Sequence, residues 1–169
     1  MQRVLVIGSP GAGKSTLSTQ LASVTGLPLF HLDQLHWNPG WVESTTAEFD
    51  DRLAAVTAGP RWIIDGNYGR TLPQRLARAD TVIDLDLPAW TCMARVISRV
   101  MRSGGTVRAD MAPDCPERLD LEFLAYIARF PGAGRRRIEA SLADFSGERV
   151  RLKRQADVRR FMQGLAARA

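Results

Sequence analysis

The sequence is poor in the features that mark secreted and membrane proteins. Its 169 residues include only two cysteines, Cys92 and Cys115, which are too few for a disulfide framework and predict two free thiols in a reducing cytoplasm. Apolar runs such as "VLVI" fall far short of the roughly 20 residues that a membrane span needs. The first run ends in a glycine-rich turn, which favours a strand over a signal peptide. We therefore expect one cytoplasmic domain over residues 1–169, with no membrane partner.

Lysine is also scarce, because 21 of the 23 basic residues are arginines. Residues 1–94 carry 7 basic and 9 acidic groups, a net charge of −2, and residues 95–169 carry 16 basic and 9 acidic groups, a net charge of +7. Arginine binds phosphate oxygens bidentately, so a basic C-terminal half suits a nucleotide or nucleic acid partner. A GC-rich genome would also replace lysine by arginine, and composition alone does not separate these two explanations.

Histidine is limited to His31 and His36. Their i, i+5 spacing misses the i, i+4 geometry of a helical metal site, and no cysteine lies nearby, so we expect no zinc-type site. We expect His31 to be buried beside a strand, and His36 to be available for contact with a substrate.

The sequence does contain a regular alternation of strand and helix patterns. Residues 33–44 read as a loop, Pro116 suits the first turn of a helix, and "PGAG" is expected to break that helix. The alternation predicts an α/β fold with a parallel sheet and helices on both faces. Strands are predicted at 3–7, 28–32, 61–65, 81–87 and 148–153, and helices at 14–25, 48–56, 71–79, 88–102, 117–130, 135–145 and 156–167.

The segment "GSPGAGKS" matches the phosphate-loop pattern G-x-x-x-x-G-K-[ST] without a mismatch. Glycines let backbone N–H groups turn toward a β-phosphate, Lys14 reaches the β- and γ-phosphates, and Ser15 offers a hydroxyl to Mg²⁺. The predicted helix from Lys14 points its positive end at the same anion. We therefore predict ATP and Mg²⁺ as cofactors, with a nucleotide site made of Gly8, Pro10, Gly11, Ala12, Gly13, Lys14, Ser15 and Thr16.

Asp65 ends the predicted strand at 61–65. An acidic residue at the carboxyl end of a strand beside a phosphate loop is where a Mg²⁺ ligand belongs. Ser15 and Asp65 are therefore the predicted metal-binding residues. The alternative is that Asp65 only caps the turn "DGNY".

Several blocks of the sequence together resemble one bacterial family. "IIDGNYGRT" and "ADTVIDLDLP" resemble the adenylate-kinase pattern of strand, D-G-F-P-R, short helix, strand and D-x-P. More closely, "HLDQLHWNPGWV", "WIIDGNYGRTLPQRLARAD", "RSGGTVRADMAPDCPERLDLEFL" and "FPGAGRRRI" resemble the P-loop kinase-like "DNA topology modulation", or FlaR-related, proteins. The resemblance runs over nearly the whole chain. It implies a P-loop NTPase three-layer sandwich with a five-stranded parallel sheet and a lid insertion at about residues 103–134.

The resemblance also implies arginines around the γ-phosphate. Arg95 and Arg99, on the helix after the fourth strand, would face that phosphate, and the lid region would add Arg118 and Arg135 to Arg137. Arg70 corresponds to the arginine of D-G-F-P-R, although "DGNYGR" is one residue longer. Each arginine could instead be a solvated surface charge. Since phosphoryl transfer needs several positive groups around the equatorial oxygens, the predicted catalytic set is Lys14, Asp33, Arg99, Arg118 and Arg137.

Residues 33–60 are the predicted acceptor-binding segment. Nucleoside monophosphate kinases need arginines in this segment, whereas only Arg52 is present here. Asp33 follows the second strand, where an acidic residue can bind an acceptor hydroxyl or accept its proton. Alternatively, Asp33 caps the next helical turn. Trp37 and Trp41 could stack on a flat acceptor or fold the loop onto the sheet.

Three functions fit these motifs. The first is a small-molecule kinase that uses ATP and an unidentified acceptor, such as a nucleotide, a nucleoside or another hydroxyl compound. The second is an ATP-binding regulator of DNA topology that contacts nucleic acid through its arginine-rich C-terminal half, and the third is an NTPase without an acceptor. The absence of a helix-turn-helix or zinc module favours the kinase. Residues 103–116 are predicted to be mobile without ligand and to close over ATP.

Overall fold

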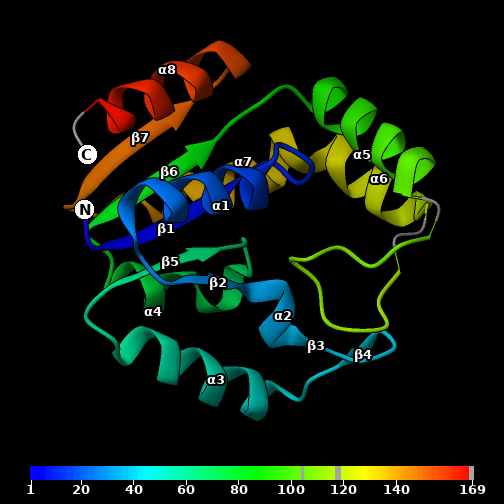
Figure 1. Ribbon diagram of the computed structural model, residues 1–169, viewed down its shortest axis with the longest axis horizontal. Coiled ribbons are helices and arrows are strands. Elements are labelled where there is room, and N and C mark those ends of the chain that lie inside the picture. The colour runs from blue at the N-terminus through cyan, green and yellow to red at the C-terminus, as the bar shows by residue number, and fades with distance from the viewer. Residues whose placement is uncertain (104, 117–118, 168–169) are drawn as a thin grey trace.

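The computed structural model describes residues 1–103, 105–116 and 119–167, which contain a five-stranded parallel sheet (Figure 1). β1 lies in the centre of the sheet, so the loop that follows it emerges in the middle of the carboxyl edge. The predicted α/β fold with five parallel strands is confirmed. The strand order is β2 (Leu29–His31), β5 (Trp62–Asp65), β1 (Arg3–Gly8), β6 (Thr81–Leu85) and β7 (Glu148–Leu152), and β3 (Trp37–Asn38) pairs with β4 (Val42–Glu43) in a separate antiparallel hairpin.

Helices cover both faces of the sheet in the described residues (Figure 1). Val4 and Val6 of β1 face one core and Leu5 and Ile7 face the other, which is the alternation expected of a strand buried on both sides. The first core includes α1, α5, α6 and α8, and the second includes α2, α3, α4 and α7. The helices are α1 (Lys14–Thr25), α2 (Leu32–His36), α3 (Thr46–Ala58), α4 (Leu72–Leu76), α5 (Ala89–Ser103), α6 (Leu121–Arg129), α7 (Arg135–Ser141) and α8 (Gln155–Ala166), with a 3-10 turn η1 (Gly69–Thr71) and a π-helical segment η2 (Phe130–Gly134).

Two predicted features of the α6 region are wrong. The helix predicted at 117–130 begins only at Leu121, because the Asp120 carboxylate caps it by accepting two N–H bonds of the first turn at 2.8 and 3.0 Å. The break predicted at "PGAG" is instead the π-helical segment η2, which joins α6 to α7. A Cβ at Gly134 would collide with the ring of Phe130, so this junction requires glycine.

Residues 33–44 are not the loop that the sequence predicted, because they form α2 and the β3–β4 hairpin. The hairpin lies beside the loop at 105–116 (Figure 1). Met111, Ala112 and Cys115 of this loop form a third small buried cluster, against which Trp37 and Trp41 pack. Cys92 and Cys115 are free thiols, as predicted, and both are buried. Among the described helices, none combines the length and apolar character that a membrane crossing requires.

Candidate active site

The phosphate loop occupies the turn from β1 into α1. Gly8 ends β1 with φ +129°, and a Cβ there would collide with the backbone of Leu85 in β6, so the close approach of the two strands requires glycine. The Ser9 N–H donates to the Leu85 carbonyl at 2.9 Å. Gly13, with φ +95°, precedes α1. The loop is therefore fixed to the sheet, with the N-terminus of α1 available to bind an anion.

Lys14, the first residue of α1, folds back over this loop. Its Nζ donates to the carbonyl oxygens of Gly8 at 3.3 Å and Ser9 at 3.2 Å. Burial lowers the pKa of Lys14, and the negative charges of Asp65 and Asp33 oppose that change. Lys14 therefore lies within electrostatic range of both carboxylates.

Asp65 ends β5 beside the loop and is 4% exposed. Its Oδ1 lies 3.1 Å from Nδ1 of His31 in β2. Burial by itself would lower the pKa of His31, but the close contact with Asp65 and the charge of that carboxylate outweigh burial and raise it. The other oxygen of Asp65, Oδ2, is buried without a hydrogen-bond partner. A buried carboxylate oxygen in this state is suited to a cation or to a bound polar group.

The residues present fit a Mg²⁺ ion that is held together with a nucleotide. In the described part of the chain, no group of three or more His, Cys, Asp or Glu side chains could hold a metal by itself. Mg²⁺ in phosphoryl-transfer sites is usually bound by one or two carboxylates together with substrate phosphates and water. Ser15 and Asp65 line the same cleft, and the unpaired Oδ2 of Asp65 matches this requirement.

Asn67 joins the loop after β5 to the phosphate loop. Its Oδ1 accepts the Gly8 N–H at 3.0 Å, and its Nδ2 donates to the Gly8 carbonyl at 2.8 Å. This reciprocal pair satisfies both backbone groups of the glycine at which β1 ends. The position of the phosphate loop therefore depends on a side chain that lies 59 residues later in the chain.

Arg75 of α4 contacts the backbone of the loop that follows β5. It is fully buried, and its guanidinium donates to the carbonyls of Gly66 and Tyr68, each at 3.0 Å, and to that of Asn67. Burial lowers the pKa of Arg75 to about 9. A buried cation that binds three successive carbonyls fixes the backbone conformation of residues 66–68.

Tyr68 connects this loop to Asp33 on α2. Its hydroxyl donates to Asp33 Oδ1 at 2.8 Å. Tyr68 has φ +31°, an unfavourable conformation for a bulky residue, which its bond to Arg75 helps to maintain. Burial raises the pKa of Asp33, and the Tyr68 hydrogen bond opposes the rise. The alternative that Asp33 caps α2 is wrong, because His31 is the N-cap and Asp33 lies inside the first turn.

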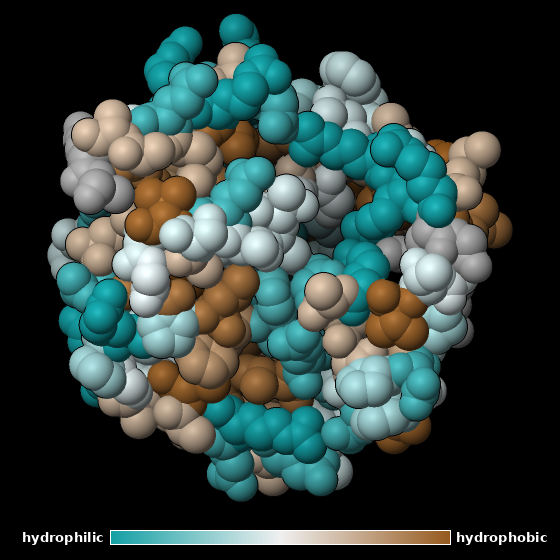
Figure 2. Space-filling model, viewed as in Figure 1, coloured by the Kyte–Doolittle hydropathy of each residue, from teal (hydrophilic) through white to brown (hydrophobic). Residues whose placement is uncertain are grey.

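One cleft of about 690 Å³ brings these groups together. Figure 2 shows the surface hollowed between the side that carries α1 and the side that carries α5 and α6. Lys14, Asp33 and Asp65 all line it, as expected for residues at the carboxyl ends of parallel strands. Arg108 and Asp110 of the loop at 105–116 complete the opposite wall.

The arginines of the predicted catalytic set have different positions. Arg99 of α5 lines the cleft. Arg118 lies outside the described residues. Arg137 of α7 is exposed and is not among the lining residues of the cleft, although its charge opposes the rise in the pKa of Tyr126, which is a lining residue. The catalytic roles of Lys14, Asp33 and these arginines stay predictions.

Two other arginines that the resemblance places near the phosphate form contacts with protein groups. Arg95 donates to the carbonyl of Ala12 in the phosphate loop at 2.7 Å. Arg135 is buried and forms ion pairs with Asp84 and Asp86, so it stabilises the junction between α7 and the sheet. We interpret Arg135 as a structural residue, in contrast to its expected place at the γ-phosphate.

Trp37 and Trp41 line the cleft and also pack against protein. Their ring centroids lie 5.2 Å apart in an edge-on arrangement, and both contact the buried cluster of the loop at 105–116. The backbone N–H of Trp41 donates to Cys115 Sγ at 3.3 Å. The two tryptophans therefore pack against the loop at 105–116, and not against the sheet as the packing alternative had it, and they join the predicted lid loop to the predicted acceptor segment. Stacking on an acceptor stays a prediction.

Sequence reasoning missed Asn67, Tyr68 and Arg75. The pattern "DGNYGR" predicts only a turn, yet an amide and an aromatic residue directly after Asp65 were an available signal, since they follow a strand end beside the phosphate loop. Arg75 gives no such signal, because an arginine in "TLPQRLARA" resembles a surface charge on a short helix.

A scan against protein-family models finds no match for this chain, and a search of curated proteins finds none either. Solved structures do share its architecture. Shikimate kinase from Acinetobacter baumannii, in complex with shikimate, has a TM-score of 0.59 and 16% identity over 98% of this chain and 90% of that one. Shikimate kinase from Bacteroides thetaiotaomicron has a TM-score of 0.54 and 15% identity over 98% and 96% of the two chains. At these identities the likeness establishes the fold alone, which is an α/β fold that this chain shares with those kinases.

Proposed function

We propose that this protein is an ATP- and Mg²⁺-dependent kinase that transfers the γ-phosphate to a hydroxyl group of a small-molecule acceptor. The observation that carries this proposal is the convergence of Lys14, Asp33 and Asp65 on one cleft. The cleft also extends past the phosphate loop to α2 and the β3–β4 hairpin, which leaves room for an acceptor. Two solved structures with this fold are shikimate kinases, so the fold is compatible with a small-molecule kinase.

The donor phosphates would bind at the phosphate loop. Backbone N–H groups of the loop and of α1 bind the β-phosphate, and Lys14 exchanges its two carbonyl partners for phosphate oxygens. Arg99, on the wall of the cleft, adds positive charge where it develops on the transferred group. Ser15 and Asp65 would hold Mg²⁺, which supplies further neutralisation of the phosphate charge.

The acceptor hydroxyl would bind at Asp33. Tyr68 fixes the carboxylate by donating to one oxygen, which leaves the other free to accept the hydroxyl proton. Burial raises the pKa of Asp33 and so makes its carboxylate a better base. The Asp33 carboxylate would orient the hydroxyl and remove its proton as the phosphate is transferred.

The alternative function, a regulator that binds nucleic acid, receives less support. Three arginines of the arginine-rich half are paired with acidic residues, and a paired arginine contributes less to binding a phosphate backbone. Arg135, Arg149 and Arg151 form ion pairs with Asp84, Asp86 and Glu139. Duplex binding that weakens steeply with salt would favour this alternative.

An acceptor screen tests the kinase. Purified protein is incubated with ATP, Mg²⁺ and hydroxyl compounds of several classes, and ADP production is compared with the rate without acceptor. We expect at least one class to raise the rate, and we expect Lys14→Ala to abolish that increase. ADP production at one constant rate across the whole screen would identify an NTPase and contradict the kinase.

A further inference from the structure

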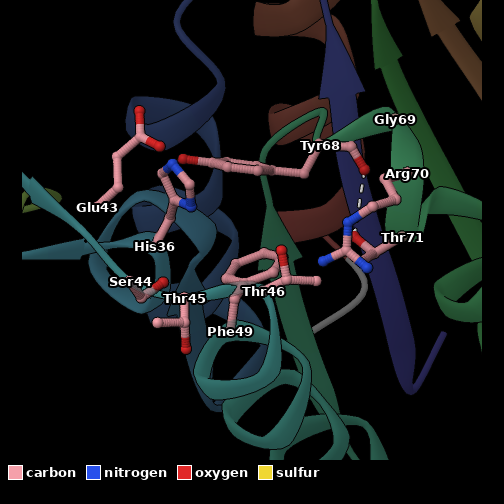
Figure 3. Close-up of a pocket in the computed structure, with 10 residues that line it drawn as sticks. All are labelled: His36, Glu43, Ser44, Thr45, Thr46, Phe49, Tyr68, Gly69, Arg70 and Thr71. Atoms are coloured by element: carbon pink, nitrogen blue, oxygen red, sulfur yellow. Dashed lines mark hydrogen bonds between the residues drawn. The ribbon is translucent and has the colours of Figure 1, made fainter.

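A second pocket of about 280 Å³ adjoins the cleft. Its walls come from α2, the chain after β4, the first turn of α3 and the turn η1 (Figure 3). Tyr68 lines both the cleft and this pocket, which we call the side pocket. None of the residues proposed to bind ATP lines the side pocket. The side pocket would therefore bind a different ligand or a different part of the acceptor.

Ser44 places an unsatisfied hydroxyl in the side pocket. The residue is 8% exposed, and its backbone N–H donates to the carbonyl of His36 at 2.8 Å. Its Oγ is buried and has no hydrogen-bond partner. Figure 3 shows this hydroxyl turned toward the interior of the pocket. Native proteins seldom bury a hydroxyl without a partner, so Ser44 is a polar group beside the pocket that a ligand could pair with.

The start of α3 supplies donors to the same pocket. Thr45 caps this 13-residue helix in a capping box, and its side chain accepts the Glu48 N–H. The N–H groups of Thr46 and Ala47 come before the first intrahelical bond and have no acceptor within the helix. Thr45 and Thr46 both line the side pocket. The positive end of a helix together with free N–H groups favours an anion.

Arg70 adds a guanidinium group to this arrangement, although its ion pair with Asp50 already offsets part of its charge. Its guanidinium donates to the two oxygens of Asp50 at 2.6 and 2.9 Å, which fixes its direction and leaves other N–H groups available. It lies 6.0 Å from the centroid of the Phe49 ring in the pocket wall. The pocket also includes the carboxylate of Glu43, but Figure 3 shows it pointing away from Ser44 and Arg70.

We propose that the side pocket binds the carboxylate or phosphate group at the non-reacting end of the acceptor. This proposal rests on the kinase function proposed above. Tyr68 borders both spaces, because its hydroxyl bonds to Asp33 in the cleft while its ring lies 5.0 Å from the His36 ring in the side pocket. An acceptor whose hydroxyl lies at Asp33 can extend past Tyr68 to place an oxyanion near Ser44. The substrate class is therefore a small hydroxy acid or a hydroxyl-bearing phosphomonoester.

An NMR titration tests the anion site independently of catalysis. The protein is first saturated with ADP, so that the phosphate loop is filled, and is then titrated with inorganic phosphate and, separately, with acetate. We expect saturable shifts of the Thr46 and Ala47 amide signals. A response to acetate alone assigns a carboxylate, and a response to phosphate alone assigns a phosphate group. The absence of saturable shifts at these two amides would overturn the proposal.

Two variants and a control sharpen this titration. Ser44→Ala and Arg70→Gln should each weaken anion binding roughly tenfold, as expected for loss of one bond to a charged group. Ser44→Ala removes a hydroxyl that has no protein partner, so the fold should be retained. Arg61→Gln removes an exposed arginine outside both pockets and should leave the titration unchanged. Equal binding by Ser44→Ala, Arg70→Gln and the wild type would contradict the site.

Kinetics then test whether the anion belongs to the acceptor. Each acceptor found in the screen is compared with a neutral analogue, such as its methyl ester or its dephosphorylated form. Ser44→Ala and Arg70→Gln should raise KM for the anionic acceptor roughly tenfold, with little change in kcat and little effect on the neutral analogue. Unchanged KM values would overturn the assignment. If no compound is phosphorylated, the kinase proposal fails, whereas the titration still decides whether the anion site exists.

Discussion

The proposed donor side and the proposed acceptor side of the cleft are built in different ways. The donor side is a single continuous turn from β1 into α1, held against the backbone of β6 at Gly8. The acceptor side is assembled from α2, the β3–β4 hairpin, the loop after β5 and the loop at 105–116. These segments meet through side-chain contacts, such as the bond from Tyr68 to Asp33, the bond from Gln34 to the Ala109 carbonyl and the small cluster around Cys115. The donor loop is therefore one contiguous segment that contacts with β6 and Asn67 hold in place, whereas the acceptor side has no single segment and depends on how several are placed.

This difference predicts which substitutions should abolish activity and which should alter acceptor selectivity. Every nucleoside triphosphate presents the same phosphates, so one backbone loop can bind them all. Acceptors differ in shape and charge, and the acceptor side can vary because its segments tolerate substitution independently. Loss of a donor residue should remove turnover, whereas loss of a peripheral acceptor residue should change KM.

The largest effect is expected at Lys14. Lys14→Ala should lower acceptor-dependent turnover by about 10³-fold, because it removes a positive group from the transferred phosphate. The folded state should be retained, since Nζ bonds only to carbonyls of its own loop. ADP production and circular dichroism check both points. Unchanged turnover in the folded variant would contradict the assignment of the donor side.

Asp33→Asn should lower turnover by roughly 10²-fold while ATP affinity stays similar, because asparagine can accept the Tyr68 hydrogen bond but cannot take a proton. Single-turnover kinetics and equilibrium binding of an ATP analogue measure the two quantities separately. An Asp33→Asn enzyme with full activity on its acceptor would show that the acceptor side does not use this carboxylate as a base.

The pH dependence of stability tests the raised pKa of Asp33 independently of catalysis. Burial raises its folded-state pKa above the ordinary value of 3.8, so the folded state binds the proton more tightly than the unfolded state. The resulting stabilisation is complete below pH 3.8 and is lost as the pH rises through the folded-state pKa. The melting temperature of the wild type relative to Asp33→Asn should therefore fall over that interval. A relative melting temperature that rises there would contradict a raised pKa.

Substitution of Arg75 tests whether the loop after β5 couples the proposed donor side to the proposed acceptor side. Arg75→Met leaves the carbonyls of residues 66–68 without their partner, which should destabilise the protein by a few kcal/mol. Since the same loop places Asn67 against the donor side and Tyr68 against the acceptor side, ADP affinity and turnover should both fall, each roughly tenfold. Arg75→Lys, which keeps a buried donor, should recover part of both.

Arg78→Met is the matched control for Arg75→Met. Arg78 is an exposed arginine that lies three residues later, so its removal should change neither ADP affinity nor turnover. Thermal unfolding, ADP titration and the turnover assay compare the three variants. Loss of stability in Arg75→Met without any change in ADP affinity or turnover would show that the loop does not transmit its position to the site.

The smallest effect is expected in the loop at 105–116. Hydrogen exchange of this loop should slow when a non-hydrolysable ATP analogue binds, because Arg108 and Asp110 line the cleft and the loop is predicted to close over the nucleotide. Amides of β1 should serve as the internal reference. Equal exchange with and without the analogue would indicate that the loop is a static wall that is fastened to Trp37 and Trp41.

The features of this protein that depend on contiguous residues can be predicted from its sequence. The alternation of strand and helix patterns was enough for the five-stranded parallel sheet, because burial on both faces dictates apolar strands and short connections. The phosphate loop can also be predicted from the sequence, since its backbone conformation needs glycines such as Gly8 and Gly13 at fixed spacing. Asp33 and Asp65 could be placed in one cleft because each ends or follows a parallel strand.

The contacts that surround those residues become visible only in the folded structure. Tyr68 meets Asp33 and Asn67 meets Gly8 across 35 and 59 residues of sequence, and no local pattern encodes either contact. Arg75 looks like a surface charge in a helical pattern, yet the fold buries it under three carbonyls. The side pocket exists because β4 and α3 approach η1, and the sequence around Ser44 does not show that the fold buries its hydroxyl without a partner. Local propensity selects the elements, whereas contacts between distant side chains depend on how those elements pack.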